Sequence, residues 1–177
     1  LLDAGISVEL LETRHVRDAF KSMPVKSDRN DARGIAQLMR LGWFRPVHCK
    51  SIEAQETRAV LTARKLLQSK LRDIENSLRG VLRGFGLKVG KTTECTFAER
   101  IRELVAGHPG LELVAKALLE AHAVLRREFN GLDKRTQKLA RSHPQARLLM
   151  TTPSVGPIVA LTYAAAIDDP KRFRSSS

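Results

Sequence analysis

Two aspartates near the N-terminal end of the chain have the side-chain type and spacing that could bind a divalent cation. Asp28 and Asp31 stand three residues apart, at the start of a segment in which Ile35, Leu38 and Met39 recur at helical spacing. On the first turn of a helix, two such carboxylates lie on one face and can converge on a single ion. Mg²⁺ is usually held by one or two protein carboxylates, with water and phosphate oxygens completing the shell. The pair is therefore a candidate metal-binding and catalytic site.

The same pair also has a purely structural interpretation. Aspartate is common at helix N-termini, because it caps free N–H groups and complements the helix dipole, and Ser27 or Asp28 is a candidate N-cap here. A D-x-x-D match arises often by chance, so the spacing alone does not decide between the two roles. Lys26, Arg29 and Arg33 surround the pair and could contact the phosphates that a bound ion would carry.

The wider segment points to a family. Residues 26–51 read K-S-D-R-N-D-A-R-G-I-A-Q-L-M-R-L-G-W-F-R-P-V-H-C-K-S, and this string resembles the DEDD-type transposases of the insertion-sequence family IS110. Those proteins are serine recombinases with a RuvC-like (RNase H-like) nuclease fold, and many are guided by a bridge RNA. In them a K-T-D-x-N-D-A segment carries the last two acids of a D-E-D-D metal-binding tetrad. Asp28 and Asp31 match these two positions, which implies a shared Mg²⁺.

The resemblance covers about residues 6–52, and the segment that opens it alternates between apolar and polar residues. Residues 6–10 therefore predict a short strand with one buried face. A lone strand is not stable, so its sheet partners are expected upstream of Leu1. The family places the first Asp and the Glu of its tetrad there as well, and Glu9 and Glu12 are not expected to replace them.

Beyond Ser51 the chain predicts two long helices, the second from about Leu111 to Arg141, with a small helix around Phe97–Val105 between them. The first heptad seam comprises Val60, Leu67, Leu71, Ile74, Leu78, Val81 and Phe85, interrupted only by the polar residue Arg64. The second comprises Leu111, Val114, Leu118, His122, Leu125, Phe129, Leu132, Thr136 and Leu139. Such seams predict an antiparallel coiled coil. His122 is expected to be a hydrogen-bonded packing residue rather than a metal ligand.

The charge balance indicates a polyanionic partner. A net charge of +12 and a pI of about 10.4 favour nucleic acid, and less often an anionic membrane surface. No apolar run approaches the roughly 20 residues that span a bilayer, and no signal peptide is present. Cys49 and Cys95 form no disulfide or metal-binding framework. These features predict a cytoplasmic protein without a membrane partner.

Cations follow the outer faces of both predicted long helices and are candidates for phosphate contacts. They are Lys65, Arg72, Arg79 and Arg83 on the first helix, and Arg127, Lys134, Lys138 and Arg141 on the second. Coiled-coil flanks usually mix charges of both signs, and acids such as Asp73 and Glu128 are present, so solvated flanks are the alternative. The excess of cations favours phosphate contacts, which would carry no sequence information.

The C-terminal part has the outline of a helix-hairpin-helix element. Residues 148–160 place a turn of small residues between two apolar helical patterns, and the N–H groups near Gly156 could face a phosphate. In the family a similar P-G-h-G-x-x-x-A stretch opens the second catalytic domain, and Ser154 stands where many members have Gly. Residues 168–173 resemble the family's next loop. A plain connection between two helices is the alternative.

Together these features predict a mainly α-helical chain. Residues 1–50 would be the end of a RuvC-like domain, 51–143 an antiparallel coiled coil, and 144–177 the start of a helical second catalytic domain. The resemblance implies that the intact protein cuts and rejoins DNA during transposition, as a homo-oligomer with a guide RNA. Its nucleophilic serine would lie in a later segment, so residues 175–177 are not expected to inherit that role, and this chain alone is expected to be inactive. The alternatives are a non-enzymatic basic coiled coil that binds RNA or DNA, and a helical scaffold.

Overall fold

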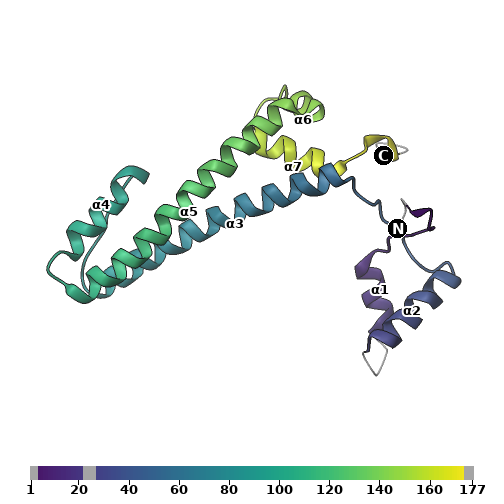
Figure 1. Ribbon diagram of the computed structural model, residues 1–177, viewed down its shortest axis with the longest axis horizontal. Coiled ribbons are helices and arrows are strands. Elements are labelled where there is room, and N and C mark those ends of the chain that lie inside the picture. Colours follow the sequence, from purple (N-terminus) through teal and green to yellow (C-terminus); the bar gives the residue numbers. More distant parts are fainter. Residues whose placement is uncertain (1–3, 22–26, 174–177) are drawn as a thin grey trace. The chain divides into compact units, whose positions relative to one another are not determined.

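The computed structural model describes residues 4–21 and 27–173, which form two compact units, 1–50 and 51–177 (Figure 1). Lys26 and residues 175–177, named above, lie outside the described residues. The described part is mainly helical and contains no β-strand. None of its helices is both long enough and apolar enough to cross a membrane.

The first unit consists of two helices and the extended segments beside them. α1 spans Thr13–Phe20 and packs against α2, which spans Asp28–Arg40. The strand expected at residues 6–10 is wrong, because these residues form no strand, and only the next residue, Leu11, makes an isolated antiparallel bridge, to Pro46. The backbone N–H of Val47 donates to the carbonyl of Leu10 at 2.8 Å, but no longer ladder follows in the described residues. The apolar side chains of residues 6, 8 and 10 are exposed rather than buried on one face.

The second unit is built on a hairpin of two long helices, as the heptad pattern predicts. α3 spans Ile52–Gly84 and α5 spans Pro109–Ser142, and the two run antiparallel along each other for about 50 Å at 1.5 Å per residue (Figure 1). Between them α4, Glu94–Val105, folds back onto α5. Thr93 and Thr96 begin α4 with a reciprocal capping box.

The buried seam differs from the predicted one near the tip of the hairpin, where α3 gives way to α4. Val81 and Val114 are about two-fifths exposed and Phe85 is 66% exposed, although all three were expected in the seam. Leu82, Ala115 and Leu119 are buried instead. The reason is that α4 adds a third helix, so the buried face turns toward it. The resulting tip cluster comprises Leu78, Leu82, Val89, Phe97, Ile101, Val105, Leu111, Ala115 and Leu119.

The middle of the hairpin is held by polar pairs that fix its register. His122 Nε2 hydrogen-bonds to Glu75 Oε1 at 2.9 Å, which confirms His122 as a hydrogen-bonded packing residue. Arg64 Nε donates to Asp133 Oδ1 at 2.6 Å. The two pairs are eleven residues apart on each helix: residues 64 and 75 lie on α3, and residues 122 and 133 lie on α5. Eleven residues are about three helical turns, so both pairs belong to one continuous antiparallel register.

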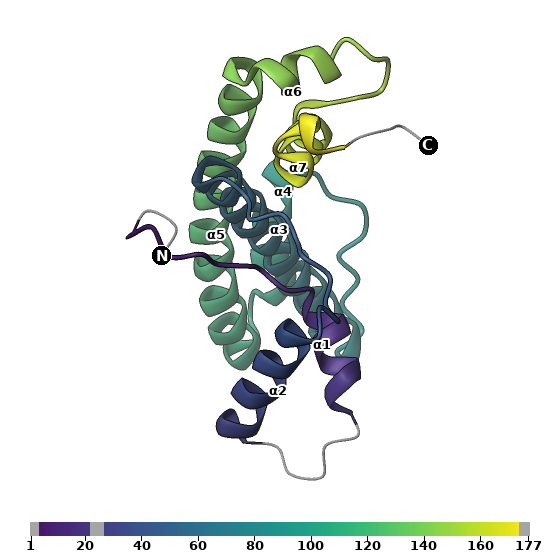
Figure 2. The same cartoon turned by 90° about the vertical axis from the view of Figure 1, so that its right-hand side faces the viewer.

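At the other end of the hairpin, two short helices pack against α3 and α5. α6 spans Pro144–Leu149 and α7 spans Pro157–Ile167, and α7 contacts both long helices (Figure 2). Their buried cluster comprises Ala140, Ala146, Ala160 and Leu161, which are fully inaccessible. A 3₁₀ turn, Pro170–Arg172, follows. Residues 144–173 thus share a unit with the hairpin, and a domain boundary at 143/144 stays a prediction.

A long-range hydrogen-bond pair joins the end of α7 to the start of α3. Asp168 Oδ2 accepts from the backbone N–H of Ser51 at 2.8 Å, and Asp168 Oδ1 accepts from Ser51 Oγ at 2.6 Å. Ser51 Oγ in turn accepts from the backbone N–H of Ala54 at 3.1 Å, as an N-cap should. Asp168 has a φ of +63° and a ψ of −85°, close to the classic γ-turn conformation, which is rare for residues other than glycine. The start of α3 is therefore fixed by a residue 117 positions away.

Candidate metal and nucleic-acid site

The first turn of α2 carries the candidate carboxylates. Ser27 is the N-cap, and its Oγ accepts from the backbone N–H of Asn30 at 3.3 Å. Because Ser27 performs the capping, Asp28 and Asp31 are not needed as caps, although both complement the helix dipole. Asp28 is exposed and Asp31 is half-buried. The helix dipole thus accounts for both acids in this turn, and their metal-binding role stays a prediction.

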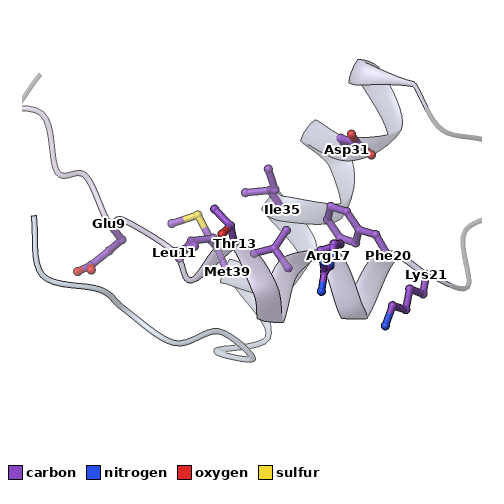
Figure 3. Close-up of a pocket in the computed structure, with 10 residues that line it drawn as sticks. Glu9, Leu11, Thr13, Arg17, Phe20, Lys21, Asp31, Ile35 and Met39 are labelled. Carbon is purple, nitrogen blue, oxygen red and sulfur yellow. The ribbon is translucent and has the colours of Figure 1, made fainter. Parts of the chain in front are cut away.

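Asp31 lies at one end of a pocket of about 660 Å³ between α1 and α2 (Figure 3). Its lining is largely apolar and includes Leu11, Val16, Phe20, Ile35 and Met39. Glu9 also lines the pocket, but it lies at the opposite end from Asp31 (Figure 3). The two carboxylates therefore do not converge in this pocket.

Two cations of α1 and its C-cap reach the same pocket. Arg17 and Lys21 line it from the side of α1. Lys21 Nζ is 2.9 Å from Asp18 Oδ1, and this hydrogen bond, with the Lys21 charge, lowers the pKa of the exposed Asp18 carboxyl below its ordinary value. Part of the positive charge near the pocket is thereby balanced within α1 itself.

The donor set of Asp28 and Asp31 fits a hard divalent cation, because carboxylate oxygens are the ligands that Mg²⁺ prefers. The described residues contain no cluster of three or more His, Cys, Asp or Glu side chains that could hold an ion without help. The pair would supply two ligands from one helical turn, and further ligands would come from water or phosphate oxygens. Arg29 and Arg33 are exposed on the same helix, where a phosphate could reach them.

The cations predicted to contact phosphates have different surroundings in the second unit. Lys65, Arg72, Arg83, Lys134, Lys138 and Arg141 are all exposed. Arg127 is exposed but lies 2.9 Å from Glu128 Oε1, so part of its charge is balanced. Surface pairs of this kind contribute little and exchange readily. A role of these side chains in phosphate binding stays a prediction.

Arg79 has surroundings unlike those of the other cations. Its Nη1 donates to the carbonyl of Gly90 at 2.7 Å, and its Nη2 donates to Thr92 Oγ1 at 2.8 Å. The guanidinium carbon also lies 5.3 Å from the centre of the Phe97 ring. The heptad spacing could not predict these contacts of Arg79. It places the residue on an outer helix face and contains no information about the loop that folds back over it.

The turn between α6 and α7 has the geometry of a hairpin between two helices. Ser154 has a φ of +69°, the left-handed conformation in which glycine is most favourable, and this is the position at which the family resemblance expects Gly. Gly156 is the N-cap of α7 and has no side chain, and Pro157 follows at the first helical position. The backbone near Gly156 is thus open to approach, while phosphate binding there stays a prediction.

Three features of the structure do not follow from the sequence patterns. The contact of Asp168 with Ser51, the N-cap of α3, is hidden because the two residues are distant in the chain, although residues 168–173 stand out as a motif. The partner of Arg64 is hidden as well, although a lone arginine in an apolar seam is a signal that an acid faces it. Lys88 and Lys91 escape the heptad pattern because they lie in a connection and not on a helix face.

Known transposases resemble this chain along most of its length. Residues 1–86 match the family model of IS110-type DEDD transposases, which is described as a transposase. The chain is 27% identical over 176 residues to the transposase for insertion sequence element IS1111A of Coxiella burnetii, covering 97% of this chain and 48% of that protein. It is 29% identical over 154 residues to a Sinorhizobium fredii protein named as transposase y4pF/y4sB, covering 85% of this chain and 39% of the other.

A third relative, a Pseudomonas aeruginosa protein named as a family 20 transposase, is 24% identical over 180 residues, which is 99% of this chain and 53% of that protein. No solved structure matches the chain at a significant level. The chain spans about half the length of the curated relatives it matches, or less. The segment with Asp28 and Asp31 lies inside the family match, so this part of the chain is similar to the DEDD transposases of the IS110 family.

Proposed function

We propose that this chain forms part of a recombinase that cuts and rejoins DNA strands during transposition of an insertion sequence. The observation that carries the proposal is the transposase family match over residues 1–86, which contains both carboxylates of the first turn of α2. Residues 1–50 would contribute to a RuvC-like nuclease fold. The rival function, a non-enzymatic basic coiled coil, does not account for this match.

In this proposal Asp28 and Asp31 hold a Mg²⁺ ion together with acids from the rest of that fold. Such an ion stabilises negative charge at a phosphate under attack. The chain's own residues orient the groups around it: Ser27 fixes the first turn of α2, and Arg29 and Arg33 contact phosphates of the bound DNA. The exposed cations of α3 and α5 bind further phosphates. The α6–α7 turn contacts the DNA backbone through the protein backbone near Gly156.

The resemblance extends the proposal to the intact protein. A serine in a later segment would act as the nucleophile, a bridge RNA would select the DNA, and the active form would be a homo-oligomer. These three features rest on the family alone. They are tested by a covalent serine–DNA adduct, by RNA that copurifies with the intact protein, and by the mass of the complex in solution.

The metal assignment is tested by replacing each carboxylate in the intact transposase. Asp28→Asn and Asp31→Asn keep the size of the side chain and remove its charge, so each is expected to reduce transposition by about a hundredfold or more and to leave the fold intact. The matched control is Asp18→Asn, which removes an exposed carboxylate of α1 that pairs with Lys21. Circular dichroism and a plasmid excision assay measure both effects. Normal transposition by both Asp28→Asn and Asp31→Asn rules out the metal role.

A further inference from the structure

The tip of the helical hairpin carries a groove that the heptad pattern does not indicate. This tip groove has a volume of about 410 Å³ and is lined by Arg79, Arg83, Leu87, Lys88, Val89, Gly90 and Lys91. Four of these described residues are cationic and none is acidic. Some cations elsewhere on the hairpin have an acidic partner, such as Lys70 with Asp73 at 3.1 Å. The tip groove is thus a concave surface of one charge sign.

The loop that forms one wall of the tip groove is held in place by its own apolar residues. Val89 is buried in the tip cluster and Leu87 packs against that cluster. Lys88 lies between them and is exposed, since its two neighbours are directed to the core. The backbone N–H of Leu87 donates to the carbonyl of Leu82 at 3.0 Å, which ties the start of the loop to α3.

Arg79 fixes the other end of this loop. Its two hydrogen bonds, to the carbonyl of Gly90 and to Thr92 Oγ1, join the last turns of α3 to the segment that precedes α4. Gly90 has a φ of +76°, a conformation that few other residues adopt, so the turn that presents its carbonyl to Arg79 depends on glycine. Lys91 follows directly and is exposed.

Helix ends explain only some of the charges in the tip groove. Arg83 lies in the last turn of α3, where a cation complements the helix dipole. Lys91 precedes Thr93, the N-cap of α4, by two residues, on the side where the positive end of a helix dipole disfavours cations. An anionic partner in the tip groove would offset this unfavourable interaction.

We propose that the tip groove binds the phosphate backbone of duplex DNA, with Arg83, Lys88 and Lys91 as the contacting cations. Arg79 is a positioning residue, which shapes the loop and does not itself contact a phosphate. The inference rests on the proposed function, because it assumes that the chain binds DNA. It adds a DNA-binding site at the tip of the hairpin to that function. Binding of this kind is independent of base sequence.

The test uses the whole 177-residue chain and a duplex of about 20 base pairs of arbitrary sequence, with affinity measured as a function of salt concentration. The variant Arg83→Gln/Lys88→Gln/Lys91→Gln is expected to reduce the log–log salt slope by about 0.9 for each phosphate that is no longer neutralised. The matched control is Lys116→Gln, because Lys116 is an exposed cation of α5 that lies one turn from both Glu112 and Glu120. The control is expected to keep the slope of the wild-type chain.

The role of Arg79 is tested by Arg79→Lys, which keeps the charge but cannot make both hydrogen bonds. We expect weaker DNA binding and faster amide hydrogen exchange in residues 90–92. Wild-type affinity and wild-type exchange in this variant overturn the positioning role.

The remaining outcomes separate the two proposals. An unchanged slope in the triple variant, while the wild-type chain still binds DNA, overturns the tip groove and leaves the proposed function standing. Failure of the wild-type chain to bind duplex DNA counts against both. A greater loss of affinity for an RNA hairpin than for the duplex overturns the assignment to DNA.

Discussion

At the scale of single residues, the hairpin depends on charged groups that the seam encloses. The side chains of Arg64 and Asp133 are 15% and 23% exposed, and the Arg64 guanidinium also lies 5.0 Å from the centre of the Phe129 ring. Asp133 Oδ2 accepts a second hydrogen bond, from Gln137 Nε2 at 2.7 Å. Each charge is thus compensated by several partners, and removal of one partner leaves the other without compensation.

This arrangement leads to a stability prediction. Asp133→Leu leaves the Arg64 charge in the seam without its acidic partner. We therefore expect the free energy of unfolding to fall by about 2–3 kcal/mol. This decrease is smaller than for a fully buried pair, because both side chains retain some exposure. The double variant Arg64→Met/Asp133→Leu is expected to recover most of that decrease, because the two apolar side chains can pack together. Urea unfolding followed by circular dichroism measures both.

The control for this prediction is the exposed pair of Lys70 and Asp73. Asp73→Leu is expected to change stability by less than about 1 kcal/mol, since both side chains are more than half exposed. Equal losses of stability in Asp133→Leu and Asp73→Leu would show that the seam does not enclose the first pair.

At the scale of elements, periodicity predicts the helices better than it predicts their buried faces. The heptads anticipate α3 and α5 because three- and four-residue steps are a local property of the sequence. They misplace Val81, Phe85 and Val114 because the third helix, α4, changes which face is covered at the tip. The expected strand at residues 6–10 fails because a strand requires partners, and periodicity contains no information about them. Asp28 and Asp31 could be found because a motif is local, whereas the groups that surround them are not.

The contact between Asp168 and Ser51 gives a prediction at the same scale. Asp168→Ala removes two acceptors from the N-terminal end of α3, so we expect the free energy of unfolding to fall by about 1 kcal/mol. Asp168→Asn keeps one side-chain acceptor, so its free energy of unfolding should fall less. Urea unfolding followed by circular dichroism measures both variants.

The neighbouring Asp169 provides the control. Its carboxylate accepts a local hydrogen bond within the loop, from the backbone N–H of Lys171 at 2.9 Å. Asp169→Ala is therefore expected to leave the unfolding of the hairpin nearly unchanged. A larger loss of stability in Asp169→Ala than in Asp168→Ala would contradict a stabilising contact between Asp168 and Ser51 at the start of α3.

At the scale of the whole molecule, the net charge of +12 must be attributed to particular surfaces. Some cations are balanced within the fold, such as Arg64 by Asp133, and Arg126 by Glu75 and Glu94 at 2.9 and 3.2 Å. Others are exposed along α3 and α5, and these two helices together carry 14 lysines and arginines against 8 acids, which is half of the net charge. A nucleic acid that follows the hairpin would neutralise them and release its own counterions.

The last prediction separates these exposed cations from solvated flanks. If Lys65, Arg72, Lys134 and Lys138 contact phosphates, replacing each by Gln should reduce the log–log salt slope of duplex DNA binding by about 0.9. The effects of distant sites should add, so the slope of the fourfold variant is expected to fall by about four times as much. Lys70→Gln is the matched control, because Asp73 already pairs with that lysine at 3.1 Å, and its slope should stay near that of the wild-type chain. If the fourfold variant and the control give the same slope, the cations of the hairpin are solvated, and the DNA-binding surface must lie elsewhere on the chain.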